Sequence, residues 1–269
     1  MKACIGLMLA AAVVLPVAAS AQDPAGGAGN RPFVEARGNV KPVPLAPGGP
    51  APRMSDGKVD LSGVWFSGPT GKANAWSVVP DEPLKQEPMP YQPWLKQKLD
   101  GLSRAELQLT SAQVTCRPLG VPGMWTTNPY PHQIVMKPGI LVHLIESNNN
   151  WRVVYTDRKE HVKPEEREPL YMGDSTVRWE GDTLVIDTVS LDERNWHTDS
   201  LHVIERFRRP SKNYLEYQYT LEDPKALTKP WTSAWRIYSL GDEPLIENFC
   251  TNNENVEQLI KLSEIESKK

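Results

Sequence analysis

Hydrophobic and polar residues alternate in short runs along the second half of the chain. Each run ends at a segment rich in Gly, Pro or Asn, and an alternation with a period of two is typical of β-strands that bury one face. The runs cover residues 132–136, 140–146, 151–157, 175–179, 183–189, 201–208, 214–221 and 231–239, and an aromatic and β-branched run at 59–68 precedes them. The pattern predicts roughly eight or nine consecutive antiparallel strands.

Helical periodicity is confined to two stretches. Residues 91–109 carry Leu95 and Leu99 at helical spacing, and Ser103 is placed as an N-cap for a second helical part. Residues 254–266 predict a short terminal helix. Strands and helices do not alternate, which argues against a doubly wound sheet. We therefore expect an all-β, mainly antiparallel fold: a single β-barrel or lipocalin-like domain with one or two short helices, able to hold one small ligand.

The first residues follow a different pattern. Lys2 precedes the apolar run 5–18, and residues 19–21, Ala-Ser-Ala, match a cleavage signal. The run is short for a bilayer span and contains Pro16. We expect a cleaved signal peptide, a periplasmic or secreted protein, and no membrane insertion after cleavage. The predicted organisation is a signal peptide (1–21), a flexible Pro/Gly/Ala-rich tether (22–57) and a β-barrel domain (58–269).

Export sets the expectation for the cysteines. Cys4 leaves with the signal, and Cys116 and Cys250 remain as an even pair in an oxidising compartment. We predict a disulfide between them; the alternative is two separate buried thiols. The formal net charge of −3 gives no reason to expect nucleic acid or an anionic membrane as a partner.

The local motifs of many catalytic classes are absent from the sequence: G-x-S-x-G, H-E-x-x-H, C-x-x-C, a Walker loop and G-x-G-x-x-G. We therefore expect chemistry from dispersed side chains, without a cofactor. The segment 195–209, NWHTDSLHVIERFRR, holds several titratable groups close together. A metal set of His197, Asp199 and His202 matches no firm ligand template, and no metal site is predicted.

Strand alternation separates the titratable groups of this segment. One face of the strand carries Leu201, Val203, Glu205 and Phe207, whereas His202 lies on the other face unless a bulge intervenes. A carboxylate on an apolar inner face needs a partner, because an isolated buried charge is very costly. We expect Glu205 to face inward and to pair with Arg152 or Arg178.

The remaining candidates lie in strands or in the loops beside them. The predicted catalytic residues are His197 or His202 as proton shuttle, Glu205 as its partner, and Arg152 and Tyr155 as groups that stabilise developing negative charge. The predicted ligand-binding residues are His132, His143, Asp157 and Arg178. His161 lies in the charged loop DRKEHVKPEERE and is expected to be solvated.

Several segments together resemble a large family of exported, mostly uncharacterised bacterial β-rich proteins with runs such as WEGDTLVVDT, LHVTERFRR and DPKAYTKPW. The matching segments are TCRPLGVPGMWTTNPYPHQIV, WRVVYTDRKEH, MGDSTVRWEGDTLVIDTV, LHVIERFRRP and DPKALTKPW, within residues 59–252. The resemblance implies an exported β-rich domain and brings no established activity. The chain departs from the family at TDRKEHV, where the family has TDGRPHP, and at Tyr171, where the family has Trp. If these residues line a site, its substrate differs here.

Two functions follow from this pattern. The first is an exported enzyme that acts on a small, aromatic organic molecule by cofactor-independent acid–base chemistry, of the lyase or isomerase type, because strands that are otherwise apolar carry many titratable groups. The alternative is a non-catalytic periplasmic binding protein for an apolar or aromatic ligand. Turnover that depends on one His or Glu indicates the enzyme, whereas saturable binding without product indicates the binding protein.

Overall fold

A computed structural model describes residues 44–68, 86–126, 130–194 and 196–250, together with residues 260, 261 and 264. The predicted signal peptide and the first part of the predicted tether lie outside the described residues, as does most of the predicted terminal helix. Within the described part of the chain, no helix is long and apolar enough to cross a bilayer.

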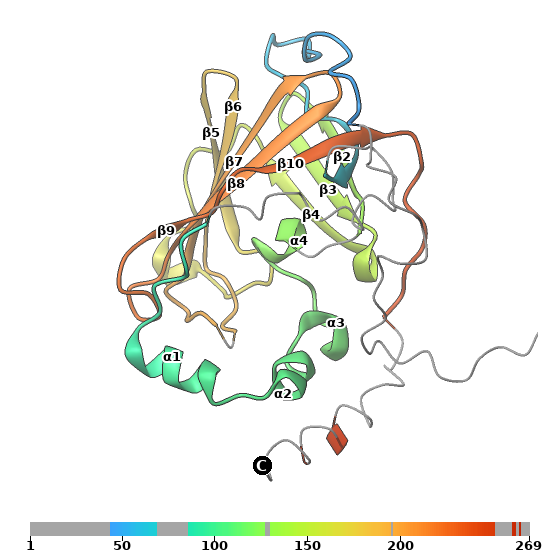
Figure 1. Ribbon diagram of the computed structural model, residues 1–269. Coiled ribbons are helices and arrows are strands. Elements are labelled where there is room, and N and C mark those ends of the chain that lie inside the picture. Colours follow the sequence, from blue (N-terminus) through green and yellow to red (C-terminus); the bar gives the residue numbers. More distant parts are fainter. Residues whose placement is uncertain are drawn as a thin grey trace, which may run out of the picture. The chain divides into compact units, whose positions relative to one another are not determined.

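The predicted strands form one antiparallel sheet (Figure 1). The strands are β1 (Gly63–Ser67), β2 (His132–Lys137), β3 (Ile140–Ile145), β4 (Asn150–Tyr155), β5 (Asp174–Glu180), β6 (Thr183–Val189), β7 (His202–Ser211), β8 (Tyr214–Glu222), β9 (Trp231–Thr232) and β10 (Arg236–Gly241). Their order in the sheet is β4-β3-β2-β1-β10-β8-β7-β6-β5, and β9 pairs with β8. Buried and exposed residues alternate along β7 and β8, as a half-buried strand requires.

The two end strands of this sheet, β4 and β5, approach each other. The backbone N–H of Val177 on β5 donates to the carbonyl of Arg158, just after β4, at 2.9 Å. The Arg152 guanidinium on β4 donates to Ser175 Oγ on β5, also at 2.9 Å. The sheet is therefore a nearly closed antiparallel barrel, and the predicted all-β fold with few helices is confirmed.

The helical segments are short: α1 (Pro93–Asp100), α2 (Arg104–Leu109), α3 (Ala112–Thr115) and α4 (Gly123–Thr126), with 3₁₀ turns η2 (Ser147–Asn149) and η3 (Pro164–Glu166). The predicted helical stretch 91–109 is divided between α1 and α2 because Ser103 starts a new helix. Its hydroxyl accepts from the N–H of Glu106, and the Glu106 carboxylate accepts from the N–H of Ser103 at 2.7 Å, which completes a capping box.

The strand predicted at 231–239 is two strands, β9 and β10, because the chain bends at Ser233. The Ser233 hydroxyl accepts from the N–H of Tyr219 at 3.1 Å and donates to the carbonyl of Ala234 at 3.0 Å. A side chain thus takes the place of a backbone partner in the ladder. After the bend, β10 pairs with β8 and β1 and brings Tyr238 into the core.

Residues 44–57, which the sequence assigns to the flexible tether, contact the barrel. The carbonyls of Pro47 and Gly49 accept hydrogen bonds from the backbone that follows β7, at 3.0 and 2.9 Å. Arg53 forms an ion pair with Asp182 at 2.7 Å, and Met54 packs against the core. Backbone carbonyls and a few side chains make these contacts. Such contacts need no periodic hydrophobic residues, so the sequence pattern does not reveal them.

The predicted disulfide between Cys116 and Cys250 is confirmed. The two Cα atoms lie 5.4 Å apart across a sequence separation of 134 residues. The bond joins the residue after α3 to the segment that follows β10. It thereby links the chain before β2 to the chain after β10.

Candidate functional site

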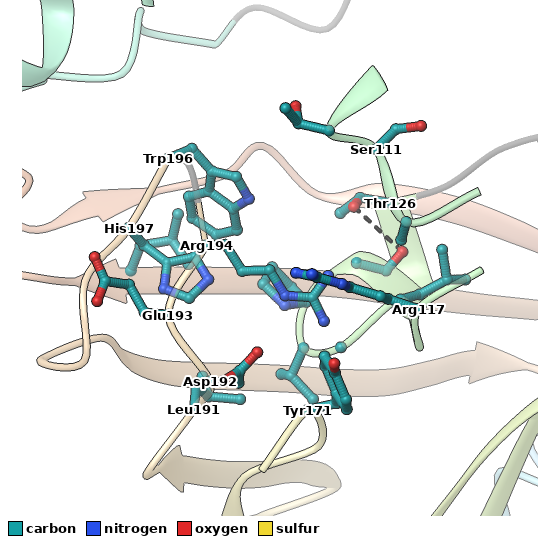
Figure 2. Close-up of a pocket in the computed structure, with 18 of the residues that line it drawn as sticks. Ser111, Arg117, Thr126, Tyr171, Leu191, Asp192, Glu193, Arg194, Trp196 and His197 are labelled. Atoms are coloured by element: carbon teal, nitrogen blue, oxygen red, sulfur yellow. Dashed lines mark hydrogen bonds between the residues drawn. The ribbon is translucent and has the colours of Figure 1, made fainter. Parts of the chain in front are cut away.

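One candidate site is a cavity of about 660 Å³ between the helical segment, the loop that holds His197 and strand β8. Figure 2 shows polar and aromatic side chains from these elements that lie around it. Its walls include residues of the loop 117–123, the start of α3, and Tyr219 and Leu221 of β8. We call this space the end cavity. Its volume is typical of small-molecule sites.

The loop 191–197 is fixed at both ends. Ser190 adopts a left-handed backbone conformation (φ 58°) at the end of β6, and the N–H of Asp192 then donates to the carbonyl of Leu170 at 3.0 Å. At the other end, the Asp223 carboxylate accepts from the backbone N–H and the hydroxyl of Thr198, at 2.6 and 2.8 Å. These bonds hold the side chains between them, including His197, at the wall of the end cavity.

His197 is the predicted catalytic residue that the structure places in the end cavity. Its Nδ1 lies 3.1 Å from the carbonyl oxygen of Thr198, so Nδ1 carries the proton and donates. Nε2 then carries the lone pair, and it has no hydrogen-bond partner among the described residues. Burial lowers the pKa of His197, and the nearby Arg194 charge adds to this, while the Thr198 carbonyl and Asp223 oppose it. The ring is therefore neutral near pH 7 and able to accept a proton.

Two arginines that sequence reasoning missed lie beside this histidine. Arg194 donates to the carbonyl of Pro118 at 2.8 Å, and its guanidinium lies over the Tyr171 ring, 4.8 Å from the centroid. Burial lowers the pKa of Arg194. The nearby Asp192 and Tyr171 raise this pKa, and the positive charge of Arg117 lowers it further. Figure 2 shows the Arg117 and Arg194 side chains reaching toward one another at the cavity wall.

Sequence reasoning had little means of finding this pair. Arg117 stands in the family-like segment TCRPLG, which was the available signal, and Arg194 stands in a loop without periodicity. The two positions are far apart in the chain and meet only through the fold.

The predicted ligand-binding histidines of β2 and β3 lie inside the barrel. His132 Nδ1 and His143 Nε2 are 3.1 Å apart, and Trp125 of α4 stacks on both rings with centroid distances of 4.3 Å. Burial lowers the pKa of His132 to about 3; it also lowers that of His143, with further contributions from His132 and Arg152. Neither histidine lines the end cavity. The pair forms part of a neutral, aromatic core beneath α4.

Glu205 faces inward as predicted and is held by an arginine. Its Oε2 lies 2.6 Å from Nη1 of Arg152, and their side chains are 0 % and 4 % exposed. Tyr217 donates its hydroxyl proton to Glu205 Oε1 at 3.0 Å. Arg152 also donates to Ser175 and Thr188 at 2.9 Å each. We call these five residues the inner network; they lie apart from His197, which corrects the prediction of a shared catalytic site.

His202 faces outward, as strand alternation predicted, and lies in a second polar cluster. Its Nε2 is 2.8 Å from Asp187 Oδ1, and its Nδ1 is 3.0 Å from Glu222 Oε2. The expectation that His161 is solvated is wrong, because its Nδ1 and Nε2 lie 3.0 and 3.1 Å from carboxylate oxygens of Asp174 and Asp187. These five residues are the outer network. Within the described ranges, no group of His, Cys, Asp and Glu is arranged to hold a metal ion.

The other predicted site residues are exposed and scattered. Tyr155 is 57 % exposed and points to the opposite face of β4 from Arg152, so the two do not act together on a charge inside the barrel. It lines an outer groove of about 750 Å³, to which Arg152 and Ser175 also contribute. Arg178 is paired with Glu180 at 3.0 Å on the outside of β5, and Asp157 is exposed in the turn after β4.

The chain matches no family model and no curated protein.

Proposed function

We propose that this protein is an exported enzyme that acts on a small, aromatic organic molecule in the end cavity, by acid–base chemistry without a cofactor. The observation that carries the proposal is the state of His197. One ring nitrogen is fixed by the Thr198 carbonyl, and the other is free at the wall of a cavity large enough for a small molecule. A neutral, oriented imidazole is the most frequent general base in enzymes.

The proposed step is the movement of one proton. Nε2 of His197 accepts a proton from an acidic C–H or O–H of the substrate, and the electron pair left behind is stabilised by the guanidinium of Arg194. Return of the proton to a neighbouring atom makes the protein an isomerase, and loss of a leaving group makes it a lyase. Trp196 and Tyr171 supply aromatic surface for an aromatic substrate.

The inner and outer networks have no direct part in this step. Arg152 and Glu205 neutralise each other in the core, and His202 is held between two carboxylates outside the barrel. We assign both networks to the stability of the barrel. The alternative function, a periplasmic protein that binds the same class of ligand without converting it, uses the same cavity and differs only in yielding no product.

Proton abstraction is measurable before the natural substrate is known. Arylacetates and arylpyruvates, which carry acidic C–H bonds, are incubated with the protein in D₂O, and deuterium incorporation is followed by NMR. We expect exchange that falls by about 10² to 10⁴ in His197→Gln, as loss of a general base requires. His202→Gln is the matched control and should exchange at the wild-type rate.

Three outcomes separate the possibilities. Exchange that survives in His197→Gln and is lost in His202→Gln contradicts the proposal and moves the chemistry to the outer network. Saturable binding of these probes without exchange in the wild-type protein supports the binding protein instead. Exchange at the wild-type rate in both variants, with folded protein by circular dichroism, indicates that neither histidine is the base.

A further inference from the structure

The end cavity has an excess of positive charge. Lys98, Arg117 and Arg194 line it, against the acidic side chains Asp192 and Glu193. His197 is neutral near pH 7, as argued from its burial, so the lining carries one net positive charge. Charges on the wall of a partly enclosed, low-dielectric space act more strongly than charges on an open surface.

The two arginines of this wall lack an acidic partner. Within the described part of the chain, neither Arg117 nor Arg194 has a carboxylate oxygen within ion-pair distance. Arg194 is half-buried, and it uses a backbone carbonyl and an aromatic ring as neighbours. A guanidinium has five N–H donors, so several of them stay available to a ligand. Two neighbouring cations repel each other, and an anion placed between them offsets this repulsion.

We infer that the ligand of the end cavity is an organic carboxylate, whose charged group is bound between Arg117 and Arg194. Guanidinium groups bind carboxylates through paired hydrogen bonds, which fix orientation as well as charge. One negative charge balances the lining, whereas a doubly charged phosphate brings an excess that Asp192 and Glu193 repel. This inference rests on the proposed function, because it names the chemical class of the molecule that His197 acts on.

The rest of the ligand is expected to be apolar. Leu119, Val121, Leu191, Leu221 and Trp196 also line the end cavity. They give the end cavity an apolar surface in addition to its charged groups. A ring attached to a carboxylate fits both the charged and the apolar residues of this lining. Such a molecule is held with its carbon skeleton near His197.

Matched acid and amide probes test the inference. Isothermal titration with benzoate and trans-cinnamate is compared with benzamide and cinnamamide, which have nearly the same shape and no charge. We expect the wild-type protein to prefer each carboxylate over its amide by tenfold or more. Arg117→Gln should lose most of this preference, because it removes one charge-assisted donor pair. Arg117→Lys should keep part of it, since Lys retains the charge without the bidentate geometry.

The controls keep the result interpretable. Arg117 is exposed and forms no ion pair with another described residue, so Arg117→Lys should unfold at the wild-type temperature and Arg117→Gln at that temperature or slightly above it. Arg178→Gln removes the same charge from the outside of β5 and should leave the preference unchanged. Equal affinity for acids and amides in the wild-type protein overturns the inference. So does an unchanged preference in Arg117→Gln, or no saturable binding of either carboxylate.

These failures are distinct from failure of the proposed function. If acids and amides bind equally and deuterium exchange still requires His197, the enzyme proposal stands and only the charge of the ligand is wrong. If carboxylates bind through Arg117 and no exchange occurs, the ligand class stands and the catalytic proposal is wrong.

Discussion

The two faces of strands β5 to β8 carry polar networks of opposite character. The inner network is centred on the Arg152–Glu205 ion pair, which is almost wholly removed from solvent. The outer network is centred on Asp187, which both His161 and His202 contact and which is 22 % exposed. Glu205 and His202 stand three residues apart on β7, so the strand alternation alone assigns them to different networks.

The two networks differ in what holds them together. In the inner network, each contact is a hydrogen bond from a guanidinium or a hydroxyl to an oxygen, and none needs an extra proton. In the outer network, both nitrogens of each imidazole lie beside carboxylate oxygens. A neutral imidazole has only one N–H, so all four contacts become hydrogen bonds only when both rings are protonated. The inner network should therefore stabilise the fold at every pH, whereas the contacts of His202 in the outer network should strengthen in acid.

The largest expected effect is that of breaking the inner ion pair. Glu205→Leu leaves Arg152 charged in the core, where its side chain is only 4 % exposed. Removal of one partner from a buried pair typically costs about 3–5 kcal/mol. We expect the free energy of unfolding in urea to fall by about this amount, with an unchanged denaturant slope.

The double variant Arg152→Met/Glu205→Leu is the control for this effect. It replaces both charges by apolar groups, which is often neutral or even stabilising in protein cores. Recovery of most of the lost stability attributes the cost to the unpaired arginine. A stable Glu205→Leu single variant contradicts this account and shows that Arg152 reaches solvent.

A smaller effect is expected from the hydroxyl of Tyr217. Tyr217→Phe keeps the ring, which packs on Phe207 with centroids 4.8 Å apart, and removes the donor to Glu205 Oε1. Loss of a buried hydrogen bond to a charged group should cost about 1–3 kcal/mol in urea unfolding. Tyr155→Phe is the matched control, since that ring is exposed and should change stability by about 0.5 kcal/mol or less. Equal effects in the two variants contradict the assignment.

The inner network was largely predictable from the sequence, because a period of two decides which side chains share a face. Alternation in residues 201–208 placed Glu205 inside and His202 outside, and the cost of a buried charge required an arginine partner. The choice between Arg152 and Arg178 needed the three-dimensional structure. The register settles it, because Arg178 lies on the outside of β5.

The end cavity and the outer network were less predictable, because loops supply their decisive residues. His161 stands in a charged loop that looks solvated in sequence, yet the loop folds back over Asp187 on β6. Arg117 and Arg194 belong to segments without hydrophobic period. Their meeting depends on the path of the chain between them, which no local pattern encodes.

The smallest expected effect comes from the outer network and depends on pH. The hydrogen bond with Asp187 raises the pKa of His202, burial opposes it, and Glu222 adds to the rise. A histidine with a raised pKa in the folded state stabilises the protein fully below its unfolded pKa, near 6.5, and this contribution is lost as pH rises through the folded pKa. His202→Gln should therefore lower the free energy of unfolding at about pH 5.5, by roughly 1 kcal/mol or less, and leave it unchanged at about pH 9.

For His197, the expected effect of pH on stability is opposite in sign to that for His202. Its pKa is lowered by burial, so the folded state resists protonation and the wild-type protein loses stability as pH falls through the unfolded pKa. His197→Gln removes this penalty, and its stability should depend less on pH on the acid side, whereas His202→Gln loses a contribution there. Urea unfolding of both variants between about pH 5 and pH 9 measures this difference in pH dependence. Asp187 stays ionised in this range. Burial raises its pKa, but the hydrogen bonds from His202 and His161 bring the pKa below its usual value. Parallel pH profiles for the two variants contradict the assignment of one histidine to a buried cavity wall and the other to a half-buried cluster of carboxylates.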